Sequence, residues 1–167
     1  MLRVCKIKRL YGVGRVAVKY QQEFLDSVVD DAKVLLESHW EEVALNKDKI
    51  KINPDWDAYY TLQEQGKLKI FTARDEGALV GYFVVFVSPH IHYKDHLFAK
   101  NDLIYLAPSH RKGFTGIKLI KFAEGCLKED GVSVLVVNTK NHKPFHKLMS
   151  FLGFTSEDVE YSKYIGD

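Results

Sequence analysis

Cysteine is scarce in this sequence, the net charge is close to zero, and no apolar run is long enough to cross a membrane. The two cysteines, Cys5 and Cys126, stand in no ligand or redox spacing, which argues against a disulfide framework and indicates a reducing compartment. Lysine and arginine, 24 in all, nearly balance 22 aspartates and glutamates, so the net charge of +2 gives no argument for a nucleic acid or an acidic membrane as partner. With no signal peptide, the sequence predicts a cytoplasmic protein.

Internal repeats, low-complexity tracts and domain linkers are also missing. The composition is that of a folded protein, with 46% hydrophobic and 13% aromatic residues. A chain of 167 residues is long enough to enclose a full core. We therefore expect a single domain over residues 1–167.

The most informative stretch is residues 101–130. It opens with an apolar run of strand length, residues 103–107, which Pro108 ends because proline has no N–H to give to a strand ladder. A short loop follows, and residues 132–137 form a second strand-like run after a helical pattern. The apolar face of that helix is formed by Gly116, Leu119, Ile120, Ala123 and Leu127.

The loop between the first of these strands and the helix is suited to hold an anion. The first turn of a helix has N–H groups without partners in the helix, and the helix dipole adds partial positive charge there. Arg111 and Lys112 add full charges, while Gly113 and Gly116 let a phosphate approach the backbone. A diphosphate therefore fits at residues 111–116.

These residues resemble a known motif. The run L-x-A-P-x-x-R-K-G-F-T-G-x-x-L-x-x-F-A is similar to the acetyl-CoA-binding segment of the GNAT superfamily of N-acyltransferases, in which V-x-P-x-x-R/Q-x-x-G-x-G/A links the fourth strand to the third helix. Arg111 matches the R/Q and Gly116 the final glycine, but Phe114 stands in place of the middle glycine. We expect Gly113 to take over the close approach to the ligand.

The resemblance continues beyond the helix. Asn138, residues 141–145 and residues 151–154 are similar to the family's fifth strand, fourth helix and closing Gly-Phe pair. The stretches at residues 92–94 and 107–113 also resemble small GNAT-like proteins of tailed phages.

The resemblance implies an α/β fold with a central mixed, mostly antiparallel sheet, splayed fourth and fifth strands, and flanking helices. It implies an enzyme that moves an acetyl group from acetyl-CoA to a primary amine by direct attack in a ternary complex, with no metal. The acceptor would be a small molecule or a protein lysine or N-terminus, and the protein a monomer or homodimer. Backbone N–H groups near Leu106 and Ala107 would stabilise the oxyanion. The predicted donor-binding residues are Leu106, Ala107, Arg111, Lys112, Gly113, Phe114, Thr115, Gly116, Asn138, Asn141 and Phe145.

The rest of the chain supplies further elements. Residues 2–10 predict a strand, and the apolar positions of residues 21–44 have helical spacing. A second helix is expected at residues 54–66, after a charged and irregular segment. Strands over residues 67–73 and 78–88 are joined by a turn of hairpin composition. The predicted order is β-α-α-β-β-β-α-β-α-β, with the last strand an extended piece around residues 161–165.

Acetyl transfer to an amine needs a base, because a protonated alkylamine, with a pKa near ~10.4, must lose a proton before it can attack. Our first candidate is Asp102, which is predicted to open the fourth strand on the face that Ile104 and Leu106 share. The alternative for Asp102 is a charged residue at a strand entrance.

Other carboxylates compete for the role of base. Glu41 and Glu42 lie near the end of the first long helix, which in the family faces the acceptor. Asp55 and Asp57 lie at the start of the second helix, where acidic residues also serve as caps.

The general acid of many GNAT enzymes is a tyrosine five residues before the phenylalanine of the closing Gly-Phe pair. Counting back from Phe154 gives Met149, so that tyrosine is missing. His146, about one helical turn earlier, is the candidate substitute, and a plain surface histidine is the alternative. A thiol with a pKa near ~8.5 leaves as a thiolate with little help, so the acid is dispensable.

The acceptor site is predicted from aromatic and acidic residues, which would suit a cationic amine, although aromatic residues at helical spacing are more often core. His90 and His92 would share a strand face at a spacing that metals can use, but no cysteine is nearby and we predict no metal. We expect their loop to flank the acceptor cleft. The predicted acceptor contacts are Trp40, Glu42, Trp56, Tyr60, His92 and Tyr93.

Two other functions remain open at the level of sequence. One is a catalytically idle GNAT domain that binds coenzyme A or a protein partner as an inhibitor or scaffold, which Met149 and Phe114 would fit. The other is a small metal-dependent domain that uses the histidines. Release of coenzyme A over a panel of amines, and metal content of the purified protein, would separate the three.

Overall fold

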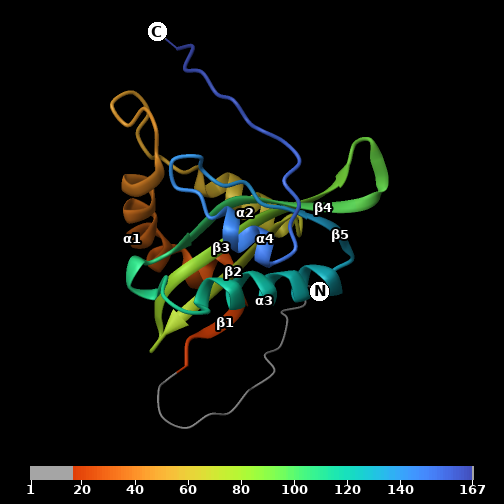
Figure 1. Ribbon diagram of the computed structural model, residues 1–167, viewed down its shortest axis with the longest axis horizontal. Coiled ribbons are helices and arrows are strands. Elements are labelled where there is room, and N and C mark those ends of the chain that lie inside the picture. The colour runs from red at the N-terminus through yellow and green to blue at the C-terminus, as the bar shows by residue number, and fades with distance from the viewer. Residues whose placement is uncertain (1–16, 167) are drawn as a thin grey trace.

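The computed structural model describes residues 17–166 (Figure 1), so the predicted strand at residues 2–10 lies outside the described part of the chain. Within residues 17–166, none of the helices is long and apolar enough to cross a membrane. The described elements are β1 (Lys19–Glu23), α1 (Leu25–Val43), α2 (Trp56–Glu64), β2 (Leu68–Asp75), β3 (Ala78–His90), β4 (Tyr93–Leu106), the 3-10 turn η1 (Pro108–His110), α3 (Thr115–Glu129), β5 (Val132–Val136) and α4 (His146–Phe151).

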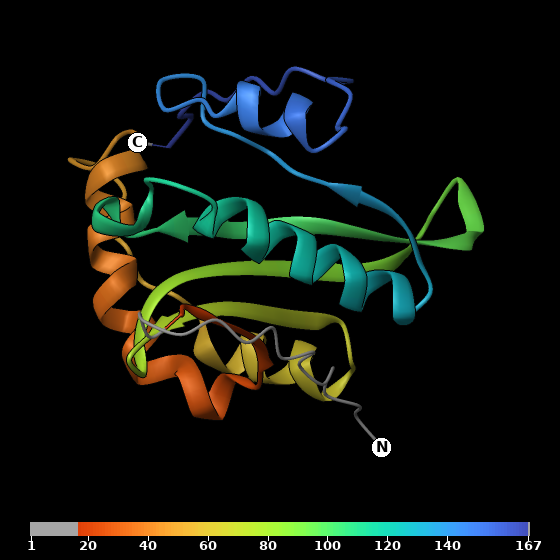
Figure 2. The same ribbon diagram turned by 60° about the horizontal axis from the view of Figure 1, so that its bottom comes forward.

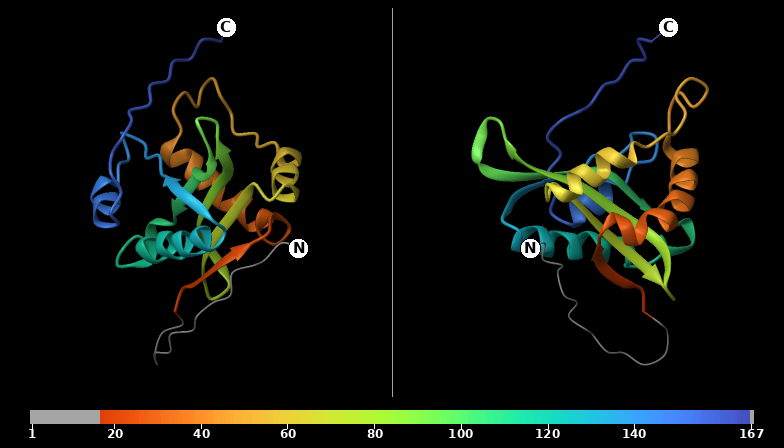
Figure 3. Two further views of the ribbon diagram at one scale, coloured as in Figure 1. Left: turned by 90° about the vertical axis from the view of Figure 1, so that its right-hand side faces the viewer. Right: turned by 180° about the vertical axis from the view of Figure 1, so that it is seen from behind.

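The strands form one sheet in the order β1-β2-β3-β4-β5. Neighbouring strands are antiparallel, except that β4 and β5 are parallel. The α/β fold with a mixed, mostly antiparallel sheet is therefore the one that the sequence predicted. Helix α3 covers one face of the sheet, and α1 and α2 cover the other, which Figures 1 and 3 show from opposite sides.

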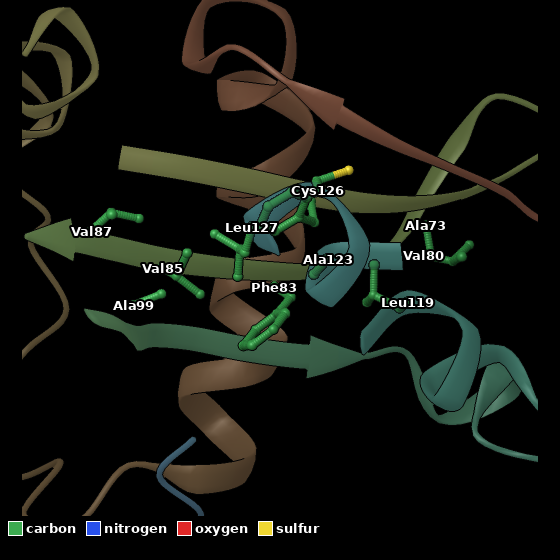
Figure 4. Close-up of a cluster of buried hydrophobic side chains, with 11 residues drawn as sticks. Ala73, Val80, Phe83, Val85, Val87, Ala99, Leu119, Ala123, Cys126 and Leu127 are labelled. Atoms are coloured by element: carbon green, nitrogen blue, oxygen red, sulfur yellow. The ribbon is translucent and has the colours of Figure 1, made fainter. Parts of the chain in front are cut away.

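The core between α3 and the sheet consists of apolar side chains (Figure 4). Alternate residues of the central strands point into it, and the predicted apolar stripe of α3 closes it, because residues three and four apart share one helix face. Its buried members are Phe71, Ala73, Val80, Phe83, Val85, Val87, Ala99, Leu119, Ala123, Cys126 and Leu127.

The core under α1 and α2 is built from the other set of strand residues. Both helices are anchored to each other, because the backbone N–H of Leu25 at the start of α1 donates to the Gln63 side chain of α2 at 2.5 Å. Asp55 caps α2 by accepting from the Ala58 N–H at 3.0 Å, which confirms the cap interpretation of that aspartate. The buried members of this core are Leu25, Val28, Leu36, Leu68, Ile70, Tyr82, Val84 and Tyr105.

Two predicted boundaries were wrong, and the strand predicted to close the chain, around residues 161–165, is not present, because the described residues after α4 form no helix or strand. The helix expected over residues 21–44 begins at Leu25, because residues 19–23 pair with β2 as the edge strand β1. The ion pair of Glu23 with Arg74, at 2.9 Å, fastens that strand to its neighbour. Strand β4 begins at Tyr93 and forms a long hairpin with β3, so Asp102 lies inside the strand and does not open it.

Candidate active site

Strands β4 and β5, at one edge of the sheet, separate partway along β4. Their pairing ends at Lys100 and Val136, and just beyond it the side chain of Asn101 bridges the two strands. Asn101 accepts from the Asn138 N–H at 2.6 Å and donates to the Asn138 carbonyl at 3.4 Å. Beyond this contact the chain after β5 runs away from β4 (Figure 2). The predicted splay of the fourth and fifth strands is therefore present, and Asn101 marks its apex.

The splay leaves backbone groups of β4 without a strand partner. The Ala107 N–H donates to the Val80 carbonyl of β3 at 2.8 Å, so it cannot face the splay. Because successive N–H groups of a strand point to opposite sides, those of Ile104 and Leu106 point away from β3 and into the splay. Of the two residues near which the oxyanion donor was expected, Leu106 has an N–H that faces the splay and Ala107 does not, and Ile104 has a second N–H that faces it.

The loop before α3 has the properties of an anion site. Gly113 has φ +87°, and a Cβ built there would meet no atom within 4 Å, so the backbone is open on that side. Phe114 precedes the helix without a side-chain cap and is exposed. The first bond of the helix runs from the Lys118 N–H to the Phe114 carbonyl, so the N–H groups between them have no partner within the helix. Gly113 thus supplies the positive φ of this loop, a backbone conformation that a phenylalanine such as Phe114 could adopt only with strain.

Arg111 does not point into this loop. Its Nε donates to the Leu106 carbonyl at 2.7 Å, and its two terminal nitrogens donate to the carboxylate of Glu42 at 2.7 and 2.6 Å. These hydrogen bonds hold the pKa of Glu42 below its ordinary value. The guanidinium that we expected to face a phosphate is committed to Glu42, and Lys112 is the exposed cation next to it.

Asp102 lies at a bulge in β4. Its neighbours Leu103 and Asn101 pair with consecutive residues of β3, so Asp102 itself is unpaired. The bulge turns its side chain to the α1–α2 side, where the Tyr59 hydroxyl donates to Oδ2 at 2.5 Å. The prediction that Asp102 shares a face with Ile104 was wrong, because Ile104 packs against the α3 core and the inserted residue breaks the alternation.

The two carboxylates nearest the splay differ in their electrostatics. Asp102 is exposed as a residue, but its carboxyl is partly enclosed beside Tyr59; this partial burial raises the pKa of Asp102 above its ordinary value, and the hydrogen bond from Tyr59 offsets part of that rise. Burial also raises the pKa of Tyr59, so its hydroxyl stays protonated and donates. Glu42 has a lowered pKa because Arg111 holds it ionised. Asp102 is therefore the better proton acceptor of the two.

The other predicted acceptor residues of α1 and α2 are spread over a wider surface. Glu41 points outward and pairs with Lys47 at 2.9 Å, so the structure does not bring it to Asp102. Trp40 lies under the same lysine at 5.4 Å. Trp56 contacts Tyr59 with ring centres 5.8 Å apart. Of this group Trp56 and Tyr60 pack in the α1–α2 core, and Trp56 also lines a narrow apolar cavity there.

The tip of the β3–β4 hairpin is far from the splay. His92 and Tyr93 lie at its tip, which projects on the side opposite to α1 in Figures 1 and 2. Tyr93 and Leu106 are the two ends of β4, on the order of 40 Å apart at the rise of an extended strand. The structure therefore does not bring His92 and Tyr93 to the splay, because β4 is longer than its apolar run indicated. Within residues 17–166, no group of three or more His, Cys, Asp and Glu side chains is placed to hold a metal ion.

Helix α4 follows the splay. His146 is exposed at its start and Met149 is buried beneath it, so a side chain at position 149 packs inward. Phe145 occupies the N-cap position. Asn141 lies in the turn before it, exposed, and is not the helix cap.

Sequence reasoning missed a buried histidine. His39 lies on the inner face of α1, three residues after Leu36, and its Nδ1 is 2.8 Å from the Tyr82 hydroxyl. Burial lowers its pKa to about 4, so the ring is neutral at pH 7. It stacks on Tyr105 with ring centres 4.7 Å apart. The signal was available, because His39 continues the apolar spacing of the helix.

A scan against protein-family models gave no match, and a search of curated proteins gave none. Solved structures do match. A ribosomal-protein-alanine N-acetyltransferase from Brucella melitensis biovar Abortus 2308 is 21% identical at a TM-score of 0.61, with 90% of this chain and 99% of that one covered. An aminoglycoside acetyltransferase from an uncultured soil metagenomic sample, in complex with sisomicin, is 17% identical at a TM-score of 0.70, with 90% and 97% covered.

A third structure carries the donor. It is a protein described as a predicted acetyltransferase from Clostridium acetobutylicum, solved with acetyl-CoA, and it is 11% identical at a TM-score of 0.66, with 89% and 97% covered. At such identities the likeness concerns the fold, which agrees with the splayed strands and the loop before α3. This chain has the fold of the GNAT acetyltransferases.

Proposed function

We propose that the protein is an N-acetyltransferase that moves the acetyl group of acetyl-CoA to a primary amine within a ternary complex. The observation that carries the proposal is the position of Asp102. Its carboxylate, with a raised pKa, lies on the α1–α2 side of the sheet, two residues along β4 from the N–H of Ile104 that points into the splay. A base and a potential oxyanion donor are thus about 7 Å apart along one strand.

The donor is proposed to bind on the other side of the splay. Its pyrophosphate would receive the unpaired N–H groups at the start of α3, from Gly113 to Gly116, together with the charge of Lys112. The pantetheine arm would extend along the backbone groups of Ile104 and Leu106 that lack a strand partner. Asn138 and Asn141, which are exposed beside the splay, are proposed as contacts for the same arm or for the nucleotide end.

The proposed reaction is a direct acyl transfer. The neutral amine nitrogen attacks the thioester carbonyl carbon, so that a C–N bond forms and the C–S bond breaks. Before this attack Asp102, directly or through one water, removes one proton from the ammonium of the acceptor. After the attack the second proton of the nitrogen passes to solvent, and coenzyme A leaves as a thiolate. Because a thiolate leaves without protonation at neutral pH, no acid is required of His146.

The acceptor is proposed to be a cationic amine, on a small molecule or on a protein. Asp102 and the aromatic residues Trp56 and Tyr59 would contact it from the α1–α2 side. Two structural neighbours are a ribosomal-protein-alanine N-acetyltransferase and an aminoglycoside acetyltransferase, and the acceptors in both names carry amines. We propose a cytoplasmic location on the ground of the sparse, unpatterned cysteines.

A steady-state assay tests the proposal. The protein is incubated with acetyl-CoA and each of a panel of amines, and release of coenzyme A is followed together with the mass of the acetylated product. We expect turnover with at least one amine. When the amine is omitted, we expect only slow hydrolysis of the acetyl-CoA thioester.

The second candidate is a GNAT-fold domain that binds coenzyme A or a protein partner without transfer. Met149 at the position of the usual tyrosine and the commitment of Arg111 to Glu42 favour it. Binding of coenzyme A without turnover on any amine of the panel would select this candidate.

A further inference from the structure

One set of side chains joins the last turn of α1, the end of β4 and the loop before α3. The ring of Tyr105 lies between side chains from both ends of this set: His39 stacks on it with ring centres 4.7 Å apart, and the guanidinium of Arg111 lies 5.1 Å from its centre. Glu42 accepts hydrogen bonds from the Tyr105 hydroxyl at 3.2 Å and from both terminal nitrogens of Arg111. We call these four residues, His39, Glu42, Tyr105 and Arg111, the β4 clasp.

The β4 clasp ends on the backbone of the strand. Arg111 Nε donates to the Leu106 carbonyl at 2.7 Å, on the side of β4 that faces the splay. At the other end, the hydroxyl of Tyr82 fixes the ring of His39 at 2.8 Å. A guanidinium that is bound bidentately and stacked on a ring has a fixed orientation, unlike a lysine ammonium, which acts as a point charge. The direction of the Leu106 carbonyl is therefore set by side chains from α1.

We propose that the β4 clasp positions the open backbone of residues 104–106 for acyl transfer, and that Arg111 acts there as a positioning residue instead of a phosphate ligand. The proposal rests on the proposed function, because the groups that it positions are the ones assigned to the thioester. It adds Glu42 and His39 to the residues on which turnover depends, although neither touches the reacting atoms.

The charges around Arg111 support positioning over phosphate binding. Both carboxylate oxygens of Glu42 are already bonded to the guanidinium, so a phosphate would have to displace an ion pair at 2.6 Å that is half shielded from solvent. Lys112 is exposed in the same loop and is available to a phosphate without such a cost.

The two roles predict opposite splits between binding and turnover. A misplacement of reacting groups by about 1 Å costs on the order of 100-fold in rate. Loss of the clasp should therefore lower kcat and leave the affinity for coenzyme A nearly unchanged. Loss of a charged hydrogen bond to phosphate should instead weaken coenzyme A by about tenfold or more and spare kcat at saturating donor.

The test is a double-mutant cycle of Glu42→Gln and Arg111→Gln, with Arg111→Lys as a further variant. For each protein, kcat and KM for acetyl-CoA are measured, and Kd for coenzyme A is measured by calorimetry. We expect each single variant to lose about 10- to 100-fold in kcat with Kd within about twofold of the parent. The double variant should be no worse than the poorer single variant, because both changes break one unit. Arg111→Lys should behave like Arg111→Gln, since it keeps the charge and loses the fork.

Lys112→Gln is the matched comparison in the same loop, and it should raise Kd and KM for the donor. Lys128→Gln, an exposed cation in the last turn of α3, controls for net charge and should change neither constant. The proposal is overturned if Arg111→Gln weakens coenzyme A while Arg111→Lys restores it, if Glu42→Gln strengthens coenzyme A by freeing Arg111, or if the effects on kcat are additive.

Failure of the proposed function is distinguishable. If the parent protein acetylates no amine, the proposed function falls, and the clasp is then judged by Kd and by amide hydrogen exchange in the same variants. The clasp predicts faster exchange at residues 104–107 in Glu42→Gln with Kd unchanged. Unchanged exchange in that variant would overturn it.

Discussion

On the α3 side of the sheet, Phe83 and Leu119 are enclosed by hydrocarbon, whereas on the α1–α2 side the core holds His39 hydrogen-bonded to Tyr82. The buried polar side chains of residues 17–166 are His39 and Thr72, and both lie on the α1–α2 side. A buried polar network costs stability unless each member is satisfied, and a fully satisfied one rigidifies the core. We infer from this contrast that the two faces contribute differently to the proposed site.

The α3 side offers a ligand mainly backbone groups. Its helix begins with N–H groups that have no partner within the helix, Gly113 leaves open space before it, and Lys112 adds one exposed charge. The α1–α2 side offers side chains, with a carboxyl of raised pKa at Asp102 and an ion pair at Glu42. Binding of the donor is therefore proposed on one side of the splay, and proton transfer on the other.

The largest effect is expected from Gly116→Glu on the α3 side. A Cβ at this position would meet Leu106 and Leu148 at ordinary contact distances, so the fold should tolerate the substitution. The added carboxylate would occupy the proposed phosphate site and repel the ligand, so binding of coenzyme A should disappear in calorimetry, a loss of more than about 100-fold.

Gly125→Glu is the matched control for that variant. It places the same side chain in the middle of the same helix, where a Cβ would meet no atom within 4 Å, and it should leave affinity unchanged. A folded Gly116→Glu protein that still binds coenzyme A as the parent does would remove the loop before α3 from the account.

Two neighbouring residues of β3 test the contrast between the faces directly. Phe83 is fully buried on the α3 side, and Phe83→Ala should lower the free energy of unfolding by about 3–5 kcal/mol while the folded fraction keeps its kcat. Tyr82 points to the other side, and Tyr82→Phe should cost only about 1 kcal/mol, since it removes one hydrogen bond to His39.

The same variant should nevertheless lower kcat, because His39 supports the β4 clasp. Urea unfolding and steady-state kinetics on both proteins measure the contrast. If Phe83→Ala lowers kcat more than Tyr82→Phe does, the division of tasks between the two faces is wrong.

A smaller effect is expected at the splay. Asn141→Ala should weaken coenzyme A by about 1 kcal/mol, the net worth of one hydrogen bond. Because Phe145 occupies the N-cap position of α4, the substitution should leave the melting temperature without ligand unchanged. An affinity equal to that of the parent would exclude Asn141 from the donor site.

Much of the fold followed from periodicity alone. The stripe of α3, with Leu119, Ala123 and Leu127, and the hairpin strands β2 and β3 are local patterns, and the structure confirms them. Strand β1 was not predictable in this way. Its polar residues, such as Gln21 and Gln22, become a strand only by pairing with β2, a contact about 50 residues away in sequence.

The site was less predictable than the fold. Asp102 could be singled out as a carboxylate near the motif, but its face depends on a bulge that the pairing with β3 creates and that no local signal marks. The pair of Glu42 and Arg111 joins positions 69 residues apart, so the motif alone indicated a free cation. His39 is the exception, since a histidine in an apolar helical stripe is visible in the sequence.

Asp102 is proposed to remove a proton from the ammonium of the acceptor. Asp102→Asn serves as the test because asparagine can still accept the hydrogen bond of Tyr59. Stability provides the control. Burial raises the folded pKa of Asp102, so its contribution to stability is present at low pH and is lost as pH rises through the folded pKa. The Asp102→Asn protein has no carboxyl to ionise at this position and so does not lose this stability, and at pH 7 its free energy of unfolding should be no lower than that of the parent.

The most direct measurement is the pH dependence of kcat for Asp102→Asn and the parent, with Kd for coenzyme A determined alongside. We expect an unchanged Kd and a loss of about 100-fold or more in kcat near pH 7, where the amine is protonated. The loss should shrink as pH approaches the pKa of the amine, near ~10.4, because the free amine no longer needs a base. A loss of equal size at every pH, or no loss at all, would contradict the assignment of Asp102 as the base.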